Sequence, residues 1–129
     1  MAPSERKAQE KELSKLMEKL EESVVLVEGK KDERALAPYI KEGRILQASG
    51  KLRTACERAS GEHVKEVVVL TDRDKAGEEL ARMAEEELGR YGIRADLETR
   101  KRLLAILRIT HVENFAKKYE EKKQELEEN

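Results

Sequence analysis

Acidic side chains follow two runs of aliphatic residues that are typical of buried strands. Glu28 comes directly after residues 24–27, and Asp72 and Asp74 come shortly after residues 67–70. In each case a helical pattern begins within a few residues. Carboxylates at the carboxyl ends of buried strands lie where open α/β sheets bind ligands. We therefore expect Glu28, Asp72 and Asp74 to converge on one site for a hard cation, Mg²⁺, with Mn²⁺ as its substitute.

The same carboxylates suggest what such a cation would do. Mg²⁺ in proteins is usually held by one or two carboxylates, by waters and by the phosphates of a substrate. Asp72 and Asp74 therefore suit a cation whose shell is completed by a phosphodiester. Glu28 is then placed either to bind the metal or to move a proton as a general acid or base. Basic side chains in the same two loops suit phosphate contacts, and these are Lys30, Lys31, Arg73 and Lys75.

Other sites with a similar order of acidic residues fit this sequence less well. In an EF-hand loop, Met83 would occupy the position where calcium binding requires a glutamate, and the run before Asp72 predicts a strand where an EF-hand has a helix. A phosphatase that forms an aspartyl phosphate also begins with a strand and Asp-x-Asp. Lys75 and the downstream sequence do not match its pattern. Asp72 and Asp74 could also serve simply as helix N-caps.

A few other reactive residue types have simpler interpretations. Cys56 is the single cysteine and falls on the apolar face of a predicted helix, so we expect a small core residue. His63 falls in a predicted loop and is expected to be solvated. His111 could contact nucleic acid, but a helix-capping or surface role is the stronger expectation. The segment 49–51 (Ser-Gly-Lys) lacks the upstream glycine of a P-loop and is expected to be a capped turn.

Length and composition favour one small, soluble domain. The chain has 129 residues, with 27 basic against 28 acidic residues, so any basic surface must be local. One cysteine and two histidines give no zinc-ligand spacing. No apolar run has transmembrane length and no secretory signal is visible, so we expect no membrane contact and a cytoplasmic location. The expected parts are an N-terminal helix (1–22), a core (23–97) and a C-terminal helical extension (98–129).

Short apolar runs alternate with helical patterns along the chain. The first helix, at 4–22, is expected to be capped by Ser4 and carries an apolar stripe of Leu13, Leu16, Met17 and Leu20. Strands are expected at 23–28, 44–47, 64–71 and 93–97. Further helices are expected at 32–42, from Ser49 to about 60, at 76–91, from Thr99 onward and at 112–127. Thr99 is expected to cap its helix, and Met83 is expected to lie on the inner face of the helix at 76–91. Pro38 should kink or break its helix, and Gly43 should end it.

This alternation predicts an α/β fold with a parallel sheet and helices on both faces. For Glu28 to meet Asp72 and Asp74, the first and third strands must be neighbours. The sheet order is then 2-1-3-4, with extra helices at both ends of the chain. The chain reverses direction between strands one and three, which is the switch point where such folds bind ligands. Topology and carboxylates therefore predict the same site.

The segments 27–32 (Val-Glu-Gly-Lys-Lys-Asp) and 71–77 (Thr-Asp-Arg-Asp-Lys-Ala-Gly) resemble the Toprim domain of topoisomerases, DnaG-type primases, OLD-family nucleases and the maturase of 5S ribosomal RNA. The resemblance covers about residues 23–97. The chain length and the segment 110–114 (Thr-His-Val-Glu-Asn) are most similar to those of small stand-alone archaeal Toprim proteins. The resemblance implies a Toprim (Rossmann-like) fold. It also implies that Asp72 and Asp74 hold Mg²⁺ and that Glu28 is the general acid/base or a metal ligand. It also implies tight turns at Gly29 and Gly77.

Together these observations predict a Mg²⁺-dependent protein that acts on phosphodiesters of RNA or DNA, as a nuclease. The alternative is a non-catalytic subunit of a primase, RNA-processing or repair assembly that uses metal only to hold phosphate. The chain is too short for the separate tyrosine-bearing domain of topoisomerases or for the accessory parts of primases. A third hypothesis is an adaptor that forms a homodimer through its terminal helices, using the stripe on residues 13–20.

Overall fold

A parallel sheet of four strands lies at the centre of the fold, and the computed structural model describes residues 1–41 and 44–127. The strands are β1 (Val24–Val27), β2 (Ile45–Gln47), β3 (Glu66–Val69) and β4 (Arg94–Asp96). The helices are α1 (Pro3–Glu22), α2 (Lys30–Leu36), α3 (Leu52–Gly61), α4 (Lys75–Gly89), α5 (Glu98–Leu107) and α6 (Phe115–Glu127), with a 3₁₀ turn η1 (Val112–Asn114) before α6. The order β2-β1-β3-β4, with every pair parallel, confirms the predicted topology.

The two central strands are buried on both faces, as their continuous apolar runs predict. Successive residues of a strand point to opposite sides of the sheet. Val25 and Val68 are paired across β1 and β3 and belong to one apolar cluster, whereas Val24 and Val67 are paired in the same way and belong to the other. The predicted arrangement with helices on both faces is therefore confirmed.

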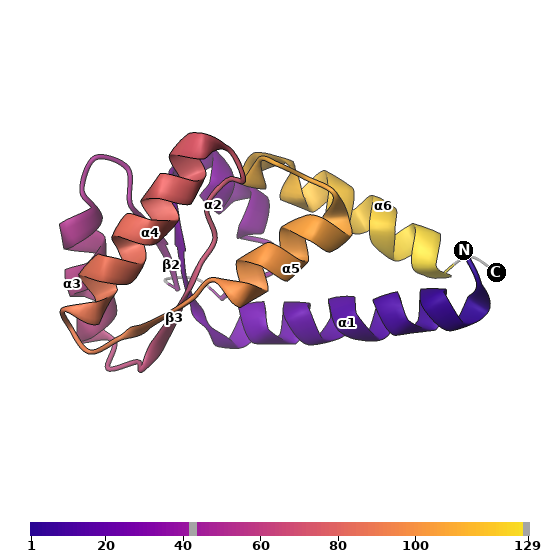
Figure 1. The fold of residues 1–129 in the computed structure, drawn as a ribbon, viewed down its shortest axis with the longest axis horizontal. Helices are drawn as coiled ribbons and strands as arrows, with labels where there is room; N and C mark the ends of the chain where they lie inside the picture. The colour runs from indigo at the N-terminus through magenta and orange to yellow at the C-terminus, as the bar shows by residue number, and fades with distance from the viewer. Residues whose placement is uncertain (42–43, 128–129) are drawn as a thin grey trace.

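One face of the sheet carries the larger apolar cluster, to which α1, α2, α5 and α6 contribute (Figure 1). Phe115 of α6 and Leu20 of α1 are fully buried there, together with Leu36 of α2 and Leu103 of α5. The opposite face is covered by α3 and α4. Cys56 lies in this second cluster with an exposed fraction of 0%, so the expectation of a core residue is confirmed.

The terminal helices pack against their own chain. In Figure 1, α1 and α6 run side by side away from the sheet, toward the end at which the N-terminus lies. The stripe Leu13, Leu16, Met17 and Leu20 is buried there against α5 and α6. The predicted Ser4 cap is wrong. The helix begins one residue earlier, because Pro3 occupies its first turn and Ala2 stands at the N-cap.

Pro38 breaks the second helix as predicted. Helix α2 ends at Leu36, and turns follow at residues 37–39, because proline lacks a backbone N–H and its ring clashes with the preceding helical turn. The prediction that the helix continues to residue 42 is thus wrong for the residues up to 41. The predicted stop at Gly43 lies outside the described residues.

Two further side chains differ from the sequence-based expectation. Met83 is 44% exposed, because the inner face of α4 is formed by Ala81, Ala84 and Leu88 and Met83 lies about 100° around the helix from Ala84. Thr99 does not cap α5. It lies inside the helix, and its N–H and hydroxyl both donate to the carboxylate of Asp96, at 3.0 and 2.5 Å.

Candidate metal centre

Glu28 and Asp72 lie at the same edge of the sheet, because they follow neighbouring parallel strands. Leu26 of β1 pairs with Val69 of β3, and the N–H of Leu70 donates to the carbonyl oxygen of Leu26 over 2.8 Å. Glu28 and Asp72 therefore leave their strands at nearly the same level. This is the switch point of the 2-1-3-4 order, where such sheets bind ligands.

Asp72 is held by a segment that lies far away in the sequence. Its Oδ1 accepts a hydrogen bond of 2.8 Å from the backbone N–H of Val112, at the start of η1. The backbone N–H of Arg73 donates to the carbonyl oxygen of Thr110, also at 2.8 Å. These two bonds dock residues 110–112 onto the loop that leaves β3, and they fix the direction of the Asp72 carboxylate.

A buried arginine, Arg100, stabilises the same loop through hydrogen bonds. The Arg100 side chain on α5 is only 7% exposed, and its Nε donates to the carbonyl oxygen of Thr71 at 2.8 Å. Its Nη2 donates to the carbonyl oxygen of Asp72 at 2.7 Å and to Glu78 at 3.0 Å. The guanidinium thus satisfies two backbone acceptors where β3 has ended and no strand partner is available.

Asp74 lies at the N-terminus of α4 and caps it. Its Oδ1 accepts from the N–H of Gly77 at 2.8 Å, while the hydroxyl of Thr71 donates to the carbonyl oxygen of Gly77 at 2.7 Å. A Cβ atom on residue 77 would lie 2.0 Å from the carbonyl oxygen of Asp72. Only glycine therefore permits this close turn, as expected for that position.

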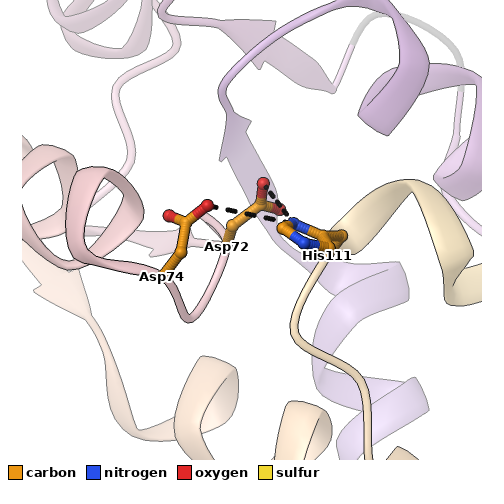
Figure 2. A group of neighbouring side chains, drawn as sticks. All are labelled: Asp72, Asp74 and His111. Atoms are coloured by element: carbon orange, nitrogen blue, oxygen red, sulfur yellow. Dashed lines mark hydrogen bonds and ion pairs between the residues drawn. The ribbon is translucent and has the colours of Figure 1, made fainter.

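The free oxygens of the two aspartates converge on His111, as Figure 2 shows. The Oδ2 atoms of Asp72 and Asp74 lie 3.3 and 3.9 Å from His111 Nδ1. One ligand atom from each of these three residues lies within 4.8 Å of the others. Among residues 1–41 and 44–127, no other group of three acidic, histidine or cysteine side chains meets this criterion. Asp72 and Asp74 are thus brought together as predicted, and His111 joins them.

This donor set fits a divalent cation. Each aspartate has one oxygen held by a backbone N–H, and this leaves the Oδ2 atoms to bind a metal. Carboxylate oxygens are the ligands that Mg²⁺ and Mn²⁺ prefer, and imidazole nitrogen is a common ligand of transition metals. The Asp72 side chain is 19% exposed and that of Asp74 43%, so an ion and a substrate phosphate can reach the site from solvent.

Glu28 lies outside the group of three, although it belongs to the same acidic edge. Its side chain is exposed. Asp32 is the buried acidic group in this region, and burial is the main cause that raises its pKa. The negative charges of Asp72, Glu28 and Glu113 raise the pKa of Asp32 further, whereas a hydrogen bond from the Gly29 N–H opposes this. Negative charge therefore accumulates along this edge, and a bound cation would relieve it.

The charge of the site also acts on His111. The contact with Asp72 is the main cause that raises the pKa of His111, and the nearby Asp74 and Glu113 act in the same direction. The imidazole therefore holds a proton more readily than a free histidine, and the proton balances part of the negative charge. His111 makes no side-chain capping bond to η1, even though it stands at the N-cap position.

The four predicted phosphate-binding cations follow the ends of β1 and β3 in the sequence. Lys30, Lys31, Arg73 and Lys75 are all exposed. Lys31 lies 4.0 Å from Glu113 with its side chain 81% exposed, so this pair is weak and can be exchanged for a phosphate. The structure tests neither phosphate binding by these four residues nor the role of Glu28, and both stay predictions.

The roles of Arg100 and Asp32 were not predicted, and His111 was expected to be a capping or surface residue and not a member of the site. Arg100 had a detectable signal, since it is a charged residue on the otherwise apolar face of a predicted helix. Asp32 stands three residues after Gly29, the spacing of a capping box, and this spacing could have been noticed. His111 offered no local signal, because its partners lie 39 and 37 residues earlier in the chain.

Comparison with known proteins agrees with this geometry. The family model of the Toprim domain matches residues 23–106, which include both strand ends and α5 except its last residue. The chain belongs to the Toprim family. The Toprim match extends beyond the predicted core of 23–97, and it ends before the segment 110–112 that docks onto Asp72.

Two relatives of this Toprim chain and one solved structure show the similarity in detail. A UPF0292 protein of Thermococcus sibiricus is 37% identical over 98 residues, which cover 74% of this chain and 77% of the relative. A UPF0292 protein of Archaeoglobus fulgidus is 34% identical over 111 residues, covering 84% and 86%. The solved structure of an Aquifex aeolicus protein superimposes with a TM-score of 0.66 at 29% identity, over 78% of this chain and 95% of that one.

Proposed function

We propose that this Toprim chain is a metal-dependent nuclease that acts on the phosphodiesters of RNA or DNA. The observation that carries the proposal is the convergence of one carboxylate oxygen each from Asp72 and Asp74 at the switch point of a Toprim sheet. Two carboxylate oxygens with open access suit Mg²⁺, whose remaining ligands are usually waters and substrate phosphates. A bound Mg²⁺ would neutralise phosphate charge and stabilise the oxygen that leaves.

In this proposal, different side chains of the protein bind the metal, move the proton and bind the flanking phosphates. Asp72 and Asp74 hold the metal through their free oxygens, while Arg100 and the 110–112 segment keep the loop in place. Glu28, exposed at the end of β1, moves the proton of the attacking or leaving group. The exposed cations bind the phosphates that flank the scissile bond, and these are Lys30, Lys31, Arg73 and Lys75.

Cleavage assays on structured RNA and nicked DNA test these roles. We expect wild-type activity to require Mg²⁺ or Mn²⁺, and Glu28→Gln and Asp72→Asn to lose at least about a hundredfold in rate. Glu57→Gln, on the exposed face of α3, removes a carboxylate far from the site and serves as the matched control. Equal activity in the wild type and the two site variants would refute the assigned roles.

A second function is favoured by the position of Glu28 outside the group of potential metal ligands. In this alternative the chain binds nucleic acid through a metal-bridged phosphate and does not cleave it. It predicts Mg²⁺-enhanced binding without turnover, and the slope of affinity against salt concentration would report the number of phosphate contacts. Binding that persists in Glu28→Gln and is lost in Asp72→Asn, with no cleavage by the wild type, would favour this function.

A homodimer through the terminal helices stays a prediction. The stripe that was expected to form the contact is buried within the single chain, so a dimer would use the outward faces of α1 and α6. Sedimentation or light scattering of the full chain would decide between monomer and dimer.

None of the helices in the described part of the chain is long and apolar enough to cross a membrane.

A further inference from the structure

The segment 110–112 contributes a third side chain to the proposed metal centre from outside the residues that match the Toprim family. The match ends at residue 106. The Arg73 N–H donates to the carbonyl oxygen of Thr110, and the Val112 N–H donates to the carboxylate of Asp72, both at 2.8 Å, with His111 between these two residues. The backbone of the segment that carries the imidazole is therefore anchored on both sides of His111.

The distances from His111 to the two aspartates are those of ligands on one ion. The distances from His111 Nδ1 to the Oδ2 atoms of Asp72 and Asp74 are 3.3 and 3.9 Å. Adjacent ligands at about 2.1 Å from an octahedral ion are separated by roughly 3 Å, and wider angles give larger separations. Figure 2 shows both carboxylates directed at the same edge of the imidazole ring. The atoms are thus placed so that a cation could contact all three at once, with the proton on Nδ1 released to solvent when the cation binds.

We infer that His111 is a protein ligand of this centre and makes it select Mn²⁺ over Mg²⁺. This inference rests on the proposed metal site at Asp72 and Asp74. Mg²⁺ binds almost entirely to oxygen, whereas imidazole nitrogen is a good ligand for first-row transition metals. A centre with two carboxylates and one imidazole therefore favours Mn²⁺ more strongly than a centre of carboxylates and water does. The exposed position of His111 leaves the remaining coordination sites open to substrate.

Direct metal binding tests the inference without any nuclease assay. Mn²⁺ and Mg²⁺ affinities of the full chain are measured by calorimetry, and bound Mn²⁺ is examined by pulsed electron paramagnetic resonance for coupling to a directly bound ¹⁴N nucleus. His111→Asn places an amide oxygen near the position of Nδ1. We expect this variant to lose the ¹⁴N coupling and to bind Mn²⁺ about tenfold or more weakly. We expect its Mg²⁺ affinity to change less, so that the preference for Mn²⁺ shrinks.

His63→Asn is the matched control, because His63 is the other histidine of the chain and precedes β3 at the opposite edge of the sheet. Its left-handed backbone, with φ of 56°, suits asparagine, so this variant should fold and should keep the ¹⁴N coupling. Absence of the coupling in wild-type protein that binds Mn²⁺, or an unchanged Mn²⁺ preference in His111→Asn, would overturn the role of His111.

The proposed function has a separate readout in the same experiment. Asp72→Asn should lose Mn²⁺ and Mg²⁺ binding together, whatever His111 does. If Asp72→Asn binds both ions as tightly as the wild type, the metal centre itself is wrong, and the proposed function and this inference fail together. Loss of binding in Asp72→Asn with no effect of His111→Asn would leave the proposed function standing and refute only the histidine ligand.

Discussion

Arg100 donates from Nη2 to the backbone carbonyl oxygen of Asp72 over 2.7 Å, and this bond joins the inner face of α5 to the first aspartate of the metal centre. The same guanidinium satisfies the carbonyl oxygen of Thr71 through Nε. A buried arginine is costly to desolvate and is retained only where hydrogen bonds compensate it. Here the acceptors are backbone groups of the loop that leaves β3, so the bonds bear on both stability and site geometry.

Replacing Arg100 with alanine should therefore destabilise the fold and loosen the metal site. We expect a loss of about 2–4 kcal/mol, because the buried carbonyl group of Thr71 and the partly buried carbonyl group of Asp72 lose their donor. Urea unfolding monitored by circular dichroism measures this loss. Arg102→Ala on the same helix is the control, since its pair with Glu98 is exposed and should contribute less than about 1 kcal/mol. Equal losses in both variants would contradict the role assigned to Arg100.

Gly77→Ala should disrupt the turn between β3 and α4. The added Cβ would lie 2.0 Å from the Asp72 carbonyl oxygen, so the backbone that carries Asp72 and Asp74 must move. We expect lower stability, by about 2 kcal/mol or more, and weaker Mn²⁺ binding. Thermal unfolding and calorimetric titration measure the two effects.

Gly89→Ala, at the other end of the same helix, is expected to lower neither the stability nor the metal binding. Nothing lies within 4 Å of a Cβ built at residue 89, and alanine restricts the unfolded chain more than glycine does. The variant should be unchanged or more stable by up to about 1 kcal/mol. It should bind Mn²⁺ like the wild type, because residue 89 ends α4 far from the aspartates. A loss of metal binding in both glycine variants would point to the helix as a whole and not to the turn at Gly77.

Much of the fold could be predicted from the sequence, because the relevant signals are local. The apolar runs around Val25 and Val68 are long enough to indicate doubly buried strands, and carboxylates directly after them mark the edge that binds ligands. Requiring Glu28 and Asp72 to meet then sets the strand order. Pro38 likewise acts on its own helix, and its effect was predicted correctly.

The rest of the site depends on long-range docking that no local pattern records. His111 and Arg100 contact Asp72, although they lie 39 and 28 residues after it in the sequence. These contacts form because α5 and the following turn pack onto the end of β3. Periodicity identifies which face of α5 is buried, yet it does not show which carbonyl groups an arginine on that face will satisfy. Met83 was misplaced for a related reason, since the apolar stripe of α4 is wider than the face that contacts the sheet.

Glu66 should make the stability depend on pH through contacts that join α1 to the sheet. Its carboxylate accepts from Lys19 of α1 and from Arg94 of β4, and the Lys19 contact is the main cause that lowers the pKa of Glu66. Because the pKa of Glu66 is lower in the folded chain than in the unfolded chain, the ionised carboxylate stabilises the fold. This stabilisation is fully present above the ordinary titration range of glutamate, and it is lost as the pH falls through the lowered pKa. The contribution should therefore disappear as the pH falls below about 4.

Glu66→Gln should accordingly be less stable than the wild type at pH 7, by about 1 kcal/mol. The difference should shrink as the pH falls toward 3, and it should also shrink at high salt, because the partner lysine is 40% exposed. Urea unfolding at pH 7, 5 and 3 measures it. A difference that is constant over this range would show that the carboxylate charge does not link α1 to the sheet.

Asp32 carries a charge that opposes folding, and Asp32→Asn should therefore stabilise the metal-free protein. Burial and the negative charges of Asp72, Glu28 and Glu113 raise the pKa of Asp32, so ionising it costs more in the folded chain than in the unfolded one. The penalty is absent below the ordinary titration range of aspartate and grows as the pH rises through the raised pKa. The N–H of Gly29 keeps an acceptor in the variant, because the asparagine side chain retains one oxygen.

The expected stabilisation by Asp32→Asn should be largest at neutral pH in a chelator and should vanish near pH 3. Glu57→Gln changes the net charge equally at an exposed position on α3, so it controls for the overall charge. Saturating Mg²⁺ or Mn²⁺ should reduce the advantage of the variant, because a cation at Asp72 offsets the negative charge that Asp32 faces. If Asp32→Asn were less stable than the wild type at pH 7 in a chelator, the cost of its charge would be smaller than the value of its hydrogen bond. If metal left the advantage unchanged, the cation would have to bind away from this edge.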